Sequence, residues 1–246
     1  MQYKLNSGFE KFEPFIKNIQ SHFKQINGNI HKARNELKIL NWNDTSVVVK
    51  SFKVPHFINK IVYTFFKDTK AKKSYDYSIK IGDFTPTPIA YVTFYKGGLL
   101  NESYFISEEF KYDFTIREPL LEENFEDKEE VFKQFAQFTY SLHENGILHQ
   151  DYSPGNILIK KEGSIYTFKI VDINRMQFIS LSLEQRLKNF CKLWAKDKDL
   201  EIIATAYAKC IKEKEQMCVE LALQYSQHHK NKINFKKRLK GIEVVD

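Results

Sequence analysis

The stretch Ile147–Ile159, "ILHQDYSPGNILI", places a histidine, an aspartate and an asparagine in a loop between two apolar segments. Asp151 and Asn156 flank "YSPG", and a Pro-Gly pair is typical of a turn. The sequence that follows has two apolar runs around "KKEGS", which predicts a β-hairpin whose second strand ends at Asp172. We therefore expect two carboxylates and one amide oxygen at one end of a small sheet.

Hard oxygen donors of this kind suit Mg²⁺, which proteins hold with one or two carboxylates together with substrate phosphates. The phosphates would need a cation of their own. Lys50 lies late in the β-branched segment "SVVVKSF", residues 46–52, which predicts a strand. The pattern as a whole indicates a site for magnesium and phosphate groups.

The predicted elements fall into two groups, with a change of pattern near residue 110. Residues 1–110 read as strands with one helix, "KAKKSYDYSIKI", which begins at Lys70. Residues 111–246 read as helical with one hairpin. The helix that begins at Lys70 is expected to place every fourth residue on one face, namely Ala71, Tyr75 and Ile79.

The second group carries its own helix signals. The segment "KEEVFKQFAQFTYSLHENG" repeats apolar residues at helical spacing, and Gly146 follows where a helix C-terminus favours glycine. Ser182 and Gln185 form a capping-box pattern at the start of a further helix. The sequence thus predicts an α+β protein with a small β-rich part followed by a compact helical part.

The motifs carry a resemblance to a known fold. "HQDYSPGN" fits the catalytic-loop pattern H-x-D-x-x-x-x-N, "KIVDIN" fits the strand that ends in the magnesium-binding aspartate, and "VVVK" is similar to the lysine strand. Their order and spacing resemble those of two-lobed protein-kinase-like folds over nearly the whole chain. More narrowly, "DYSPGNIL", "VDINRM" and "TPTPIAY" resemble the bacterial lipopolysaccharide core kinases, which phosphorylate heptose or Kdo sugars.

The resemblance implies a role for each motif residue in ATP-dependent phosphate transfer. Asp151 would accept or orient the proton of the attacking hydroxyl, while Asn156 and Asp172 would hold Mg²⁺ against the phosphates of ATP. Lys50 would contact the α- and β-phosphates. Asp76, on the first helix, would pair with Lys50 where the family more often has glutamate. We interpret His149 as structural, with its ring bonded to the backbone near Asp172.

Some features depart from the protein-kinase pattern. No G-x-G-x-x-G precedes Lys50, and the nearby "NGNIHKARNE" offers only Gly28, with Lys32 or Arg34 as helpers for a phosphate-covering loop. No A-P-E follows "DIN", and 74 residues remain after Asp172 in the 246-residue chain. These gaps favour a small-molecule or glycan acceptor over a protein acceptor.

Composition sets wider limits. A hydrophobic content of 42% favours a globular fold, and a formal charge of +7 favours an anionic partner. The chain has three cysteines without a CxxC pair, no signal-peptide pattern, and an apolar run at 61–66 far below the roughly 20 residues that span a bilayer. We therefore expect a cytoplasmic protein, with no nucleic-acid partner because no recognised module is present.

The tail "HKNKINFKKRLK" holds six cations, from Lys230 to Lys240. It is either a solvated end or a contact with anionic lipid at the inner face of the inner membrane, where a lipid-linked core glycan would lie. Two other functions stay open. One is phosphate transfer to an aminoglycoside or choline-like alcohol, and the other is a pseudokinase that binds nucleotide or a partner. The sequence also leaves Mg²⁺ and Mn²⁺ undecided.

Overall fold

The computed structural model describes the chain except residues 26–30, 33–34, 54–55 and 244–246. It divides into two compact units, one of residues 1–111 with 172–174 and one of residues 112–171 with 175–246. The boundary expected near residue 110 lies beside this division. Asp172–Asn174, however, group with the first unit and not with the residues that flank them in sequence.

The first unit is built on a six-stranded sheet with the order β1-β5-β6-β4-β3-β2, and every neighbouring pair is antiparallel. The strands are β1 (Gln2–Leu5), β2 (His31–Lys32), β3 (Asn35–Trp42), β4 (Thr45–Phe52), β5 (Pro88–Lys96) and β6 (Leu99–Glu108). The predicted strand at 46–52 corresponds to β4. A tight turn at Gly97 and Gly98 joins β5 to β6, because both glycines adopt positive φ.

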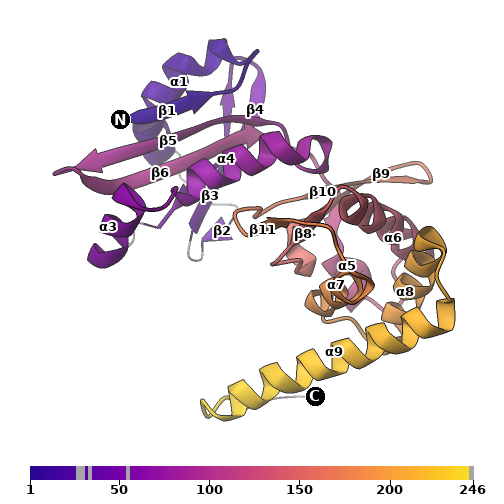
Figure 1. Ribbon diagram of the computed structural model, residues 1–246. Coiled ribbons are helices and arrows are strands. Elements are labelled where there is room, and N and C mark those ends of the chain that lie inside the picture. The colour runs from indigo at the N-terminus through magenta and orange to yellow at the C-terminus, as the bar shows by residue number, and fades with distance from the viewer. Residues whose placement is uncertain (26–30, 33–34, 54–55, 244–246) are drawn as a thin grey trace. The chain divides into compact units, whose positions relative to one another are not determined.

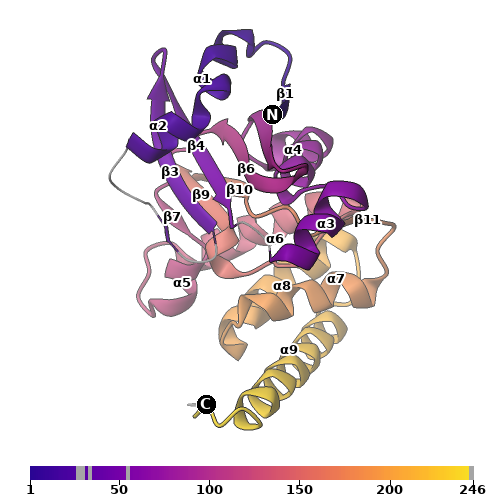
Figure 2. The ribbon, with the colours of Figure 1, turned by 90° about the vertical axis from the view of Figure 1, so that its left-hand side faces the viewer.

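Alternation along β4 assigns its side chains to two faces of the sheet. Val47 and Val49 are buried in a core with the N-terminal helices, η1 (Glu10–Phe12), α1 (Glu13–Lys17) and α2 (Ile19–Gln25). Phe52 packs on the opposite face against α4 (Lys70–Ile81), which lies across β5 and β6 (Figures 1 and 2). Lys50 has the parity of Phe52, so it lies on the α4 face.

The prediction of a single helix in this part of the chain was wrong. The structure adds η1, α1 and α2, and also α3 (Phe57–Phe65) before α4. The signal was present, because buried apolar residues recur every three or four positions through "FEKFEPFIKNIQSHF", at Phe12, Phe15, Ile16, Ile19 and Phe23. Pro14 stands in the first turn of α1, where proline is favoured.

Helix α4 has the predicted bounds but not the predicted inner face. Ala71 and Tyr75 are buried as expected, whereas Ile79 is 48% exposed. Two steps of four residues turn a helix about 80° beyond two full turns, so Ile79 rotates away from the sheet. Ser78 and Ile81 complete the buried face in its place.

The second unit contains two small sheets, ordered β10-β9-β7 and β11-β8, with helices around them. Its strands are β7 (Phe114–Thr115), β8 (Ile147–His149), β9 (Ile157–Glu162), β10 (Ile165–Ile170) and β11 (Met176–Phe178). Its helices are α5 (Arg117–Leu121), α6 (Lys128–Glu144), α7 (Leu183–Asn189), α8 (Asp197–Ile211) and α9 (Glu215–Arg238), with the short 3-10 helices η3 (Pro154–Asn156) and η4 (Phe190–Leu193). A further short 3-10 helix, η2 (Gly82–Phe84), follows α4 in the first unit. No helix of the described residues is long and apolar enough to cross a membrane.

Three local predictions for the second unit are confirmed. The hairpin forms as β9 and β10, in antiparallel register from Ile157↔Ile170 to Glu162↔Ile165. Ser182 and Gln185 form both hydrogen bonds of the capping box at the start of α7. Gly146 ends α6 with φ of +67°, and a Cβ there would lie 2.9 Å from the backbone oxygen of Ile179, so glycine is required on both counts.

A buried polar chain connects α6, α7 and α8 to strand β8. The Asn189 side-chain amide donates to the carbonyl oxygen of His149 at 3.0 Å, and its Oδ1 lies 3.2 Å from His143 Nε2. His143 Nδ1 lies 2.7 Å from the Tyr207 hydroxyl. Because Asn189 Oδ1 can only accept, Nε2 of His143 donates and Nδ1 accepts from Tyr207. The neutral imidazole thus satisfies both neighbours.

The buried histidine of this hydrogen-bonded chain, His143, makes folding stability depend on pH. Burial lowers the pKa of His143 from its ordinary 6.5 to about 4. Between these two values the unfolded chain binds more protons than the folded chain, so the free energy of unfolding falls as the pH drops through this window. The full loss is about 3 kcal/mol. Urea unfolding at pH 7, 5.5 and 4 should show a shallower decline for His143→Gln; parallel declines would contradict the assignment.

Candidate active site

The loop after β8 is shaped by bonds to the backbone oxygen of Asp151. That oxygen accepts from the N–H of Ser153 at 2.7 Å and from the side-chain amide of Asn156 at 2.8 Å. The carbonyl is therefore held inside the turn, whereas the carboxylate is 45% exposed. The "DYSPGN" sequence thus folds into a rigid turn with its acid available to solvent.

His149 fixes the start of this loop, as the sequence predicted. Its Nδ1 accepts the backbone N–H of Asp151 at 3.0 Å, and its Nε2 lies 2.9 Å from the carbonyl oxygen of Val171. Since a carbonyl can only accept, Nε2 carries the proton and the ring is the neutral Nε2–H tautomer. Both ring nitrogens are used by backbone groups, so His149 is not placed to act as a general base.

Asn156 joins the loop to the end of the hairpin. The backbone carbonyl oxygen of Asn156 accepts from the backbone N–H of Val171 at 2.9 Å, and Val171 directly precedes Asp172. The side-chain nitrogen is committed to Asp151, which leaves Oδ1 as the remaining donor atom for a cation. The side-chain amide of Asn156 therefore has a structural role, because it closes the turn that presents the carboxylate of Asp151.

Two arginines lie beside the loop. Arg175 Nη1 is 4.0 Å from the carboxylate of Asp151, and its side chain is 61% exposed. A Cβ on Gly155 would lie 2.6 Å from Nη2 of Arg117, so the absence of a side chain at Gly155 lets this guanidinium approach the turn. The sequence analysis missed Arg117, because nothing local links α5 to the loop.

A buried tyrosine anchors the loop from below. The Tyr152 hydroxyl lies 2.8 Å from Oγ1 of Thr139, and its ring stacks on Phe135 with centroids 5.8 Å apart. Tyr152 is fully buried, although it stands between the half-buried Asp151 and Ser153. Together with Asn189, it is a supporting residue that the sequence analysis did not identify; the available signal was one aromatic residue among the polar residues of "QDYS".

Lys50 and Asp172 form the second cluster, within the first unit. Lys50 Nζ lies 2.7 Å from Oδ1 of Asp172, and the lysine side chain is only 12% exposed. The same Oδ1 accepts from the side-chain amide of Asn174 at 2.5 Å, a residue that the sequence analysis did not single out. Asp172 has φ of +56°, a conformation that non-glycine residues seldom adopt and that is common at functional sites.

The partner of Lys50 differs from the one expected. Lys50 is paired with Asp172 and not with Asp76, and the described residues contain no ion pair between Lys50 and Asp76. Asp76 is half-buried on α4, the helix that covers the same face of the sheet as Lys50. Pairing of Asp76 with Lys50 stays a prediction, for a state in which Asp172 has exchanged the lysine for another cation.

The donor set of these residues fits Mg²⁺. Asp172 carries a carboxylate and Asn156 an amide oxygen, and both are hard donors of the kind that Mg²⁺ prefers. The described residues hold no group of three or more His, Cys, Asp or Glu side chains that could bind a metal ion. Of the residues considered for a phosphate-covering loop, Gly28 and Arg34 lie outside the described part of the chain.

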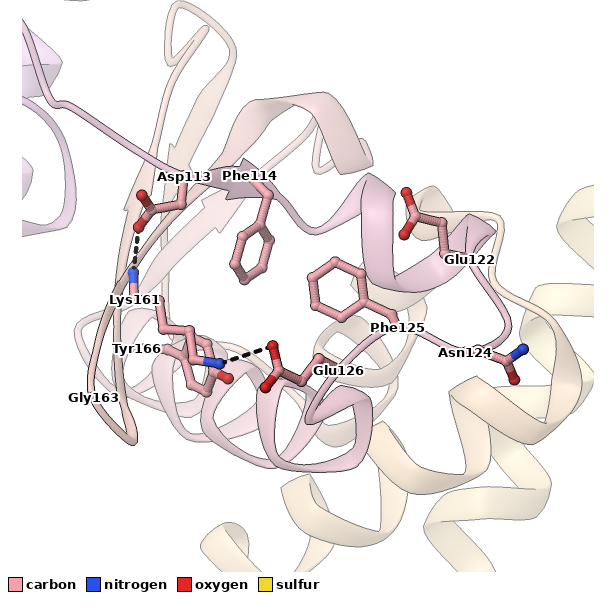
Figure 3. Close-up of a pocket in the computed structure, with 9 residues that line it drawn as sticks. All are labelled: Asp113, Phe114, Glu122, Asn124, Phe125, Glu126, Lys161, Gly163 and Tyr166. Atoms are coloured by element: carbon pink, nitrogen blue, oxygen red, sulfur yellow. Dashed lines mark hydrogen bonds and ion pairs between the residues drawn. The ribbon is translucent and has the colours of Figure 1, made fainter.

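A cavity of about 660 Å³ lies elsewhere in the second unit (Figure 3). Its lining is aromatic and acidic, formed by Asp113, Phe114, Glu122, Asn124, Phe125, Glu126, Lys161, Gly163 and Tyr166. Phe114 and Phe125 meet edge to face at 4.9 Å, and Lys161 lies 3.5 Å from Glu126. None of the residues predicted for phosphate transfer lines this cavity, so we do not assign it to the reaction.

Comparison with proteins of known structure identifies the fold. No protein-family model matches the chain. Among solved structures, WaaP in complex with acyl carrier protein aligns with a TM-score of 0.60 at 12% identity, over 94% of this chain and 99% of that one. The chain has a protein-kinase-like fold. The complex of Rio2 kinase with ADP/Mg²⁺ and phosphoaspartate from Chaetomium thermophilum aligns with a TM-score of 0.48 at 12% identity, over 85% of this chain and 67% of that one.

Proposed function

We propose that the protein is an ATP-dependent kinase that phosphorylates a sugar hydroxyl of the lipopolysaccharide core, on heptose or Kdo. The observation that carries the proposal is the rigid turn after β8, which exposes the Asp151 carboxylate while its backbone and His149 hold the loop. The likeness to WaaP supports it, because the sequence motifs resemble the lipopolysaccharide core kinases and the fold agrees with that resemblance.

In the proposed reaction, Asp151 orients the acceptor hydroxyl and takes its proton. The acceptor oxygen then forms a bond to the γ-phosphorus of ATP as the bond to the leaving ADP oxygen breaks. The hydrogen bonds that hold Asp151 use its backbone, so the carboxylate is left for the acceptor and for Arg175, whose Nη1 lies 4.0 Å from it. Because the backbone of Asp151 holds the turn and its carboxylate does not, the arrangement favours a role for this carboxylate as a positioned base.

Lys50, Asn156 and Asp172 bind the nucleotide in this proposal. Asn156 and Asp172 hold Mg²⁺, which supplies charge neutralisation for the phosphates when it is bound. Lys50 turns from Asp172 to the α- and β-phosphates, and Asp76 becomes its carboxylate partner. The low exposure of Lys50 supports this role, because a buried ammonium needs an anion and a phosphate can replace the carboxylate.

The surroundings of Asp151 support an anionic acceptor. Arg175 and Arg117 bring two guanidiniums to the loop, and guanidinium groups bind carboxylate and phosphate in bidentate fashion. A Kdo carboxylate or a phosphorylated core sugar matches these cations. An aminoglycoside or choline-like acceptor carries positive charge and would be repelled, so we rank this alternative lower.

The test is phosphate transfer from γ-labelled ATP to a panel of acceptors. We expect labelled core oligosaccharide containing heptose or Kdo, and no transfer to kanamycin, choline or a protein substrate. Mass spectrometry of the product identifies the sugar that gains one phosphate. ATP binding without transfer to any acceptor would favour the pseudokinase alternative, and transfer to kanamycin or choline would replace the core sugar as the acceptor.

The basic tail gives a separate prediction about membrane contact. Lys230 is committed within the fold, since it donates to the carbonyl of Ala195 at 2.7 Å and lies 3.7 Å from Asp197. Further along the same segment, the exposed Lys232, Lys236 and Lys240 flank the exposed Phe235 and Leu239, and we propose that these side chains meet lipid. We expect removal of residues 232–246 to weaken binding to anionic vesicles and activity on membrane-anchored acceptor, while activity on soluble core oligosaccharide persists.

Vesicle sedimentation at 50 and 300 mM salt checks this prediction, because attraction between cations and anionic lipid is screened by salt. The control is a chain in which the cations are kept and Phe235 alone is replaced by serine. Equal binding of the full and shortened chains to anionic vesicles would mean that the tail is an ordinary solvated end.

A further inference from the structure

Helix α3 exposes large apolar side chains on the first unit. Phe57, Ile58, Phe65 and Phe66 are 68%, 76%, 66% and 78% exposed, and Phe66 and Ile58 are the two most exposed large apolar side chains of the described residues. All four fall within ten consecutive positions. Scattered apolar residues on a surface are ordinary, but a contiguous patch indicates an interaction site.

The helix is fixed to the sheet by its other side. Oγ1 of Thr64 accepts the backbone N–H of Leu100 at 2.9 Å, and α3 packs against β6. Ile58, Val62 and Phe65 recur at spacings of four and three, so they share one face of the helix. Val62 is half-buried while Ile58 and Phe65 are exposed, so this apolar stripe runs outward from the sheet.

The charges next to the stripe in the sequence are mainly positive. From Lys53 to Lys67 the chain contains no acidic residue, and Lys53 and Lys67 are exposed. The acid that follows, Asp68, is paired with Lys72 at 2.7 Å. Lys96 is also exposed, and it pairs in the β5–β6 register with Leu99, next to the Leu100 that bonds α3. The apolar stripe therefore has a cationic rim.

We propose that α3 and Phe66 form a peripheral docking surface for an anionic phospholipid membrane. Ile58, Phe65 and Phe66 enter the boundary between headgroups and acyl chains, and the flanking lysines contact lipid phosphates. A helix of nine residues is about 14 Å long, so it lies in the plane of the interface and does not cross it. This surface extends the proposed function, since it would bring the chain to a lipid-linked acceptor. It consists only of residues of the first unit and includes none of the proposed catalytic residues.

Charge selects the membrane over a second copy of the chain. In a two-fold dimer through α3 the same patch meets itself, and the lysines of one rim face the lysines of the other. An anionic lipid surface offers opposite charge to the rim and an apolar layer to the stripe. Both features of the patch then have a matching partner.

The experiment compares matched serine substitutions in the full-length chain. Ile58→Ser with Phe66→Ser removes apolar area from α3, and Leu121→Ser with Ile165→Ser removes similarly exposed apolar side chains, 71% and 64%, from the second unit. With phosphatidylglycerol-containing vesicles, we expect the α3 pair to weaken binding at least about 10-fold and the control pair less than about 2-fold. Because insertion is apolar, the α3 effect should persist at 300 mM salt, unlike the effect of shortening the tail.

Insertion has its own readout. Phe66→Trp should shift its fluorescence to shorter wavelength on anionic vesicles and be quenched by lipids brominated on the acyl chains, relative to the native chain. Leu121→Trp should show neither change. This measurement keeps the proposal testable if the serine pair unfolds at a lower temperature than the native chain.

Each outcome decides the proposal. Equal vesicle binding by the α3 pair and the control pair, or no quenching of Phe66→Trp, overturns it. Concentration-dependent dimerisation that Ile58→Ser abolishes, without vesicle binding, assigns the patch to a second copy and also overturns it. Vesicle binding through α3 in a chain that transfers no phosphate to soluble core oligosaccharide would support the docking surface while the proposed kinase activity fails.

Discussion

Asp172→Ala should abolish the magnesium-dependent part of ATP affinity and lower phosphate transfer by on the order of 10³-fold or more. In the proposed site, the carboxylate of Asp172 is the only negatively charged protein ligand of Mg²⁺, beside the amide oxygen of Asn156. Metal stabilisation of the phosphates amounts to several kcal/mol, and each 1.4 kcal/mol is about tenfold in rate. Calorimetric titration of ATP with and without Mg²⁺ measures the first effect, and transfer to core oligosaccharide measures the second.

The substitution also breaks the ion pair with Lys50, so a control must separate binding from stability. Asp68→Ala removes a carboxylate from an ion pair of the same length, 2.7 Å, in the same unit, but one whose partners are 40% and 50% exposed. We expect Asp68→Ala to cost less than about 1 kcal/mol of stability and to leave ATP affinity unchanged. An Asp172→Ala protein that is folded and still binds ATP more tightly with Mg²⁺ would remove Asp172 as a metal ligand.

Substitution of Lys50 distinguishes a metal-binding role of Asp172 from a purely structural one. If the 2.7 Å bond between Lys50 and Asp172 only stabilised the fold, Lys50→Ala and Asp172→Ala would lower stability alike and affect nucleotide binding alike. In the proposed site the lysine binds phosphate directly and the aspartate binds through the metal. Lys50→Ala should therefore weaken ATP both with and without Mg²⁺, whereas Asp172→Ala removes only the difference between the two.

The elements that the sequence predicted well are those whose signals are local. The β9–β10 hairpin, the end of α6 at Gly146 and the capping box at Ser182 each depend on a few neighbouring residues. Alternation, a positive-φ glycine and a short cap motif are readable without knowledge of tertiary contacts. The order of the motifs around Asp151 and Asp172 was enough to predict the protein-kinase-like fold.

The contacts that position the loop could not be predicted, because they join residues far apart in the chain. Asn189 donates to the carbonyl of His149, and Arg117 packs over Gly155, from helices that no local pattern links to the loop. Lys50 and Asp172 are likewise brought together only by the fold. Sequence motifs name the reacting groups, while the residues that hold them depend on packing.

The helices missed in the first unit had a different cause. The apolar spacing through Phe12, Ile16 and Ile19 is helical, but several aromatic residues in that stretch also favour strands, and short segments leave the two periods hard to separate. Helix α3 has the same ambiguity, since "FINKIVYTFF" is rich in β-branched and aromatic residues. Its helical conformation is what gathers Ile58, Val62 and Phe65 on one face; as a strand they would not share a side.

Asp151→Asn should lower the rate of phosphate transfer by about 10²–10⁴-fold while leaving ATP affinity close to that of the native chain. The substitution replaces one carboxylate oxygen by an amide nitrogen of similar size. It keeps the backbone carbonyl that accepts from Ser153 and Asn156, so the turn itself is preserved. Single-turnover transfer to soluble core oligosaccharide, at saturating ATP, measures the chemical step without contributions from membrane binding.

Asp197→Asn is the matched control, because Asp197 is also an exposed aspartate of the second unit in a long ion pair, 3.7 Å from Lys230. It should transfer phosphate at the native rate. If Asp151 served only to pair with Arg175, then Arg175→Gln would reproduce the loss seen for Asp151→Asn. In the proposed site Arg175 binds the acceptor, so Arg175→Gln should raise KM for the glycan more than it lowers kcat, whereas Asp151→Asn lowers kcat. Near-native transfer by Asp151→Asn would show that the proton leaves the acceptor without help from this carboxylate.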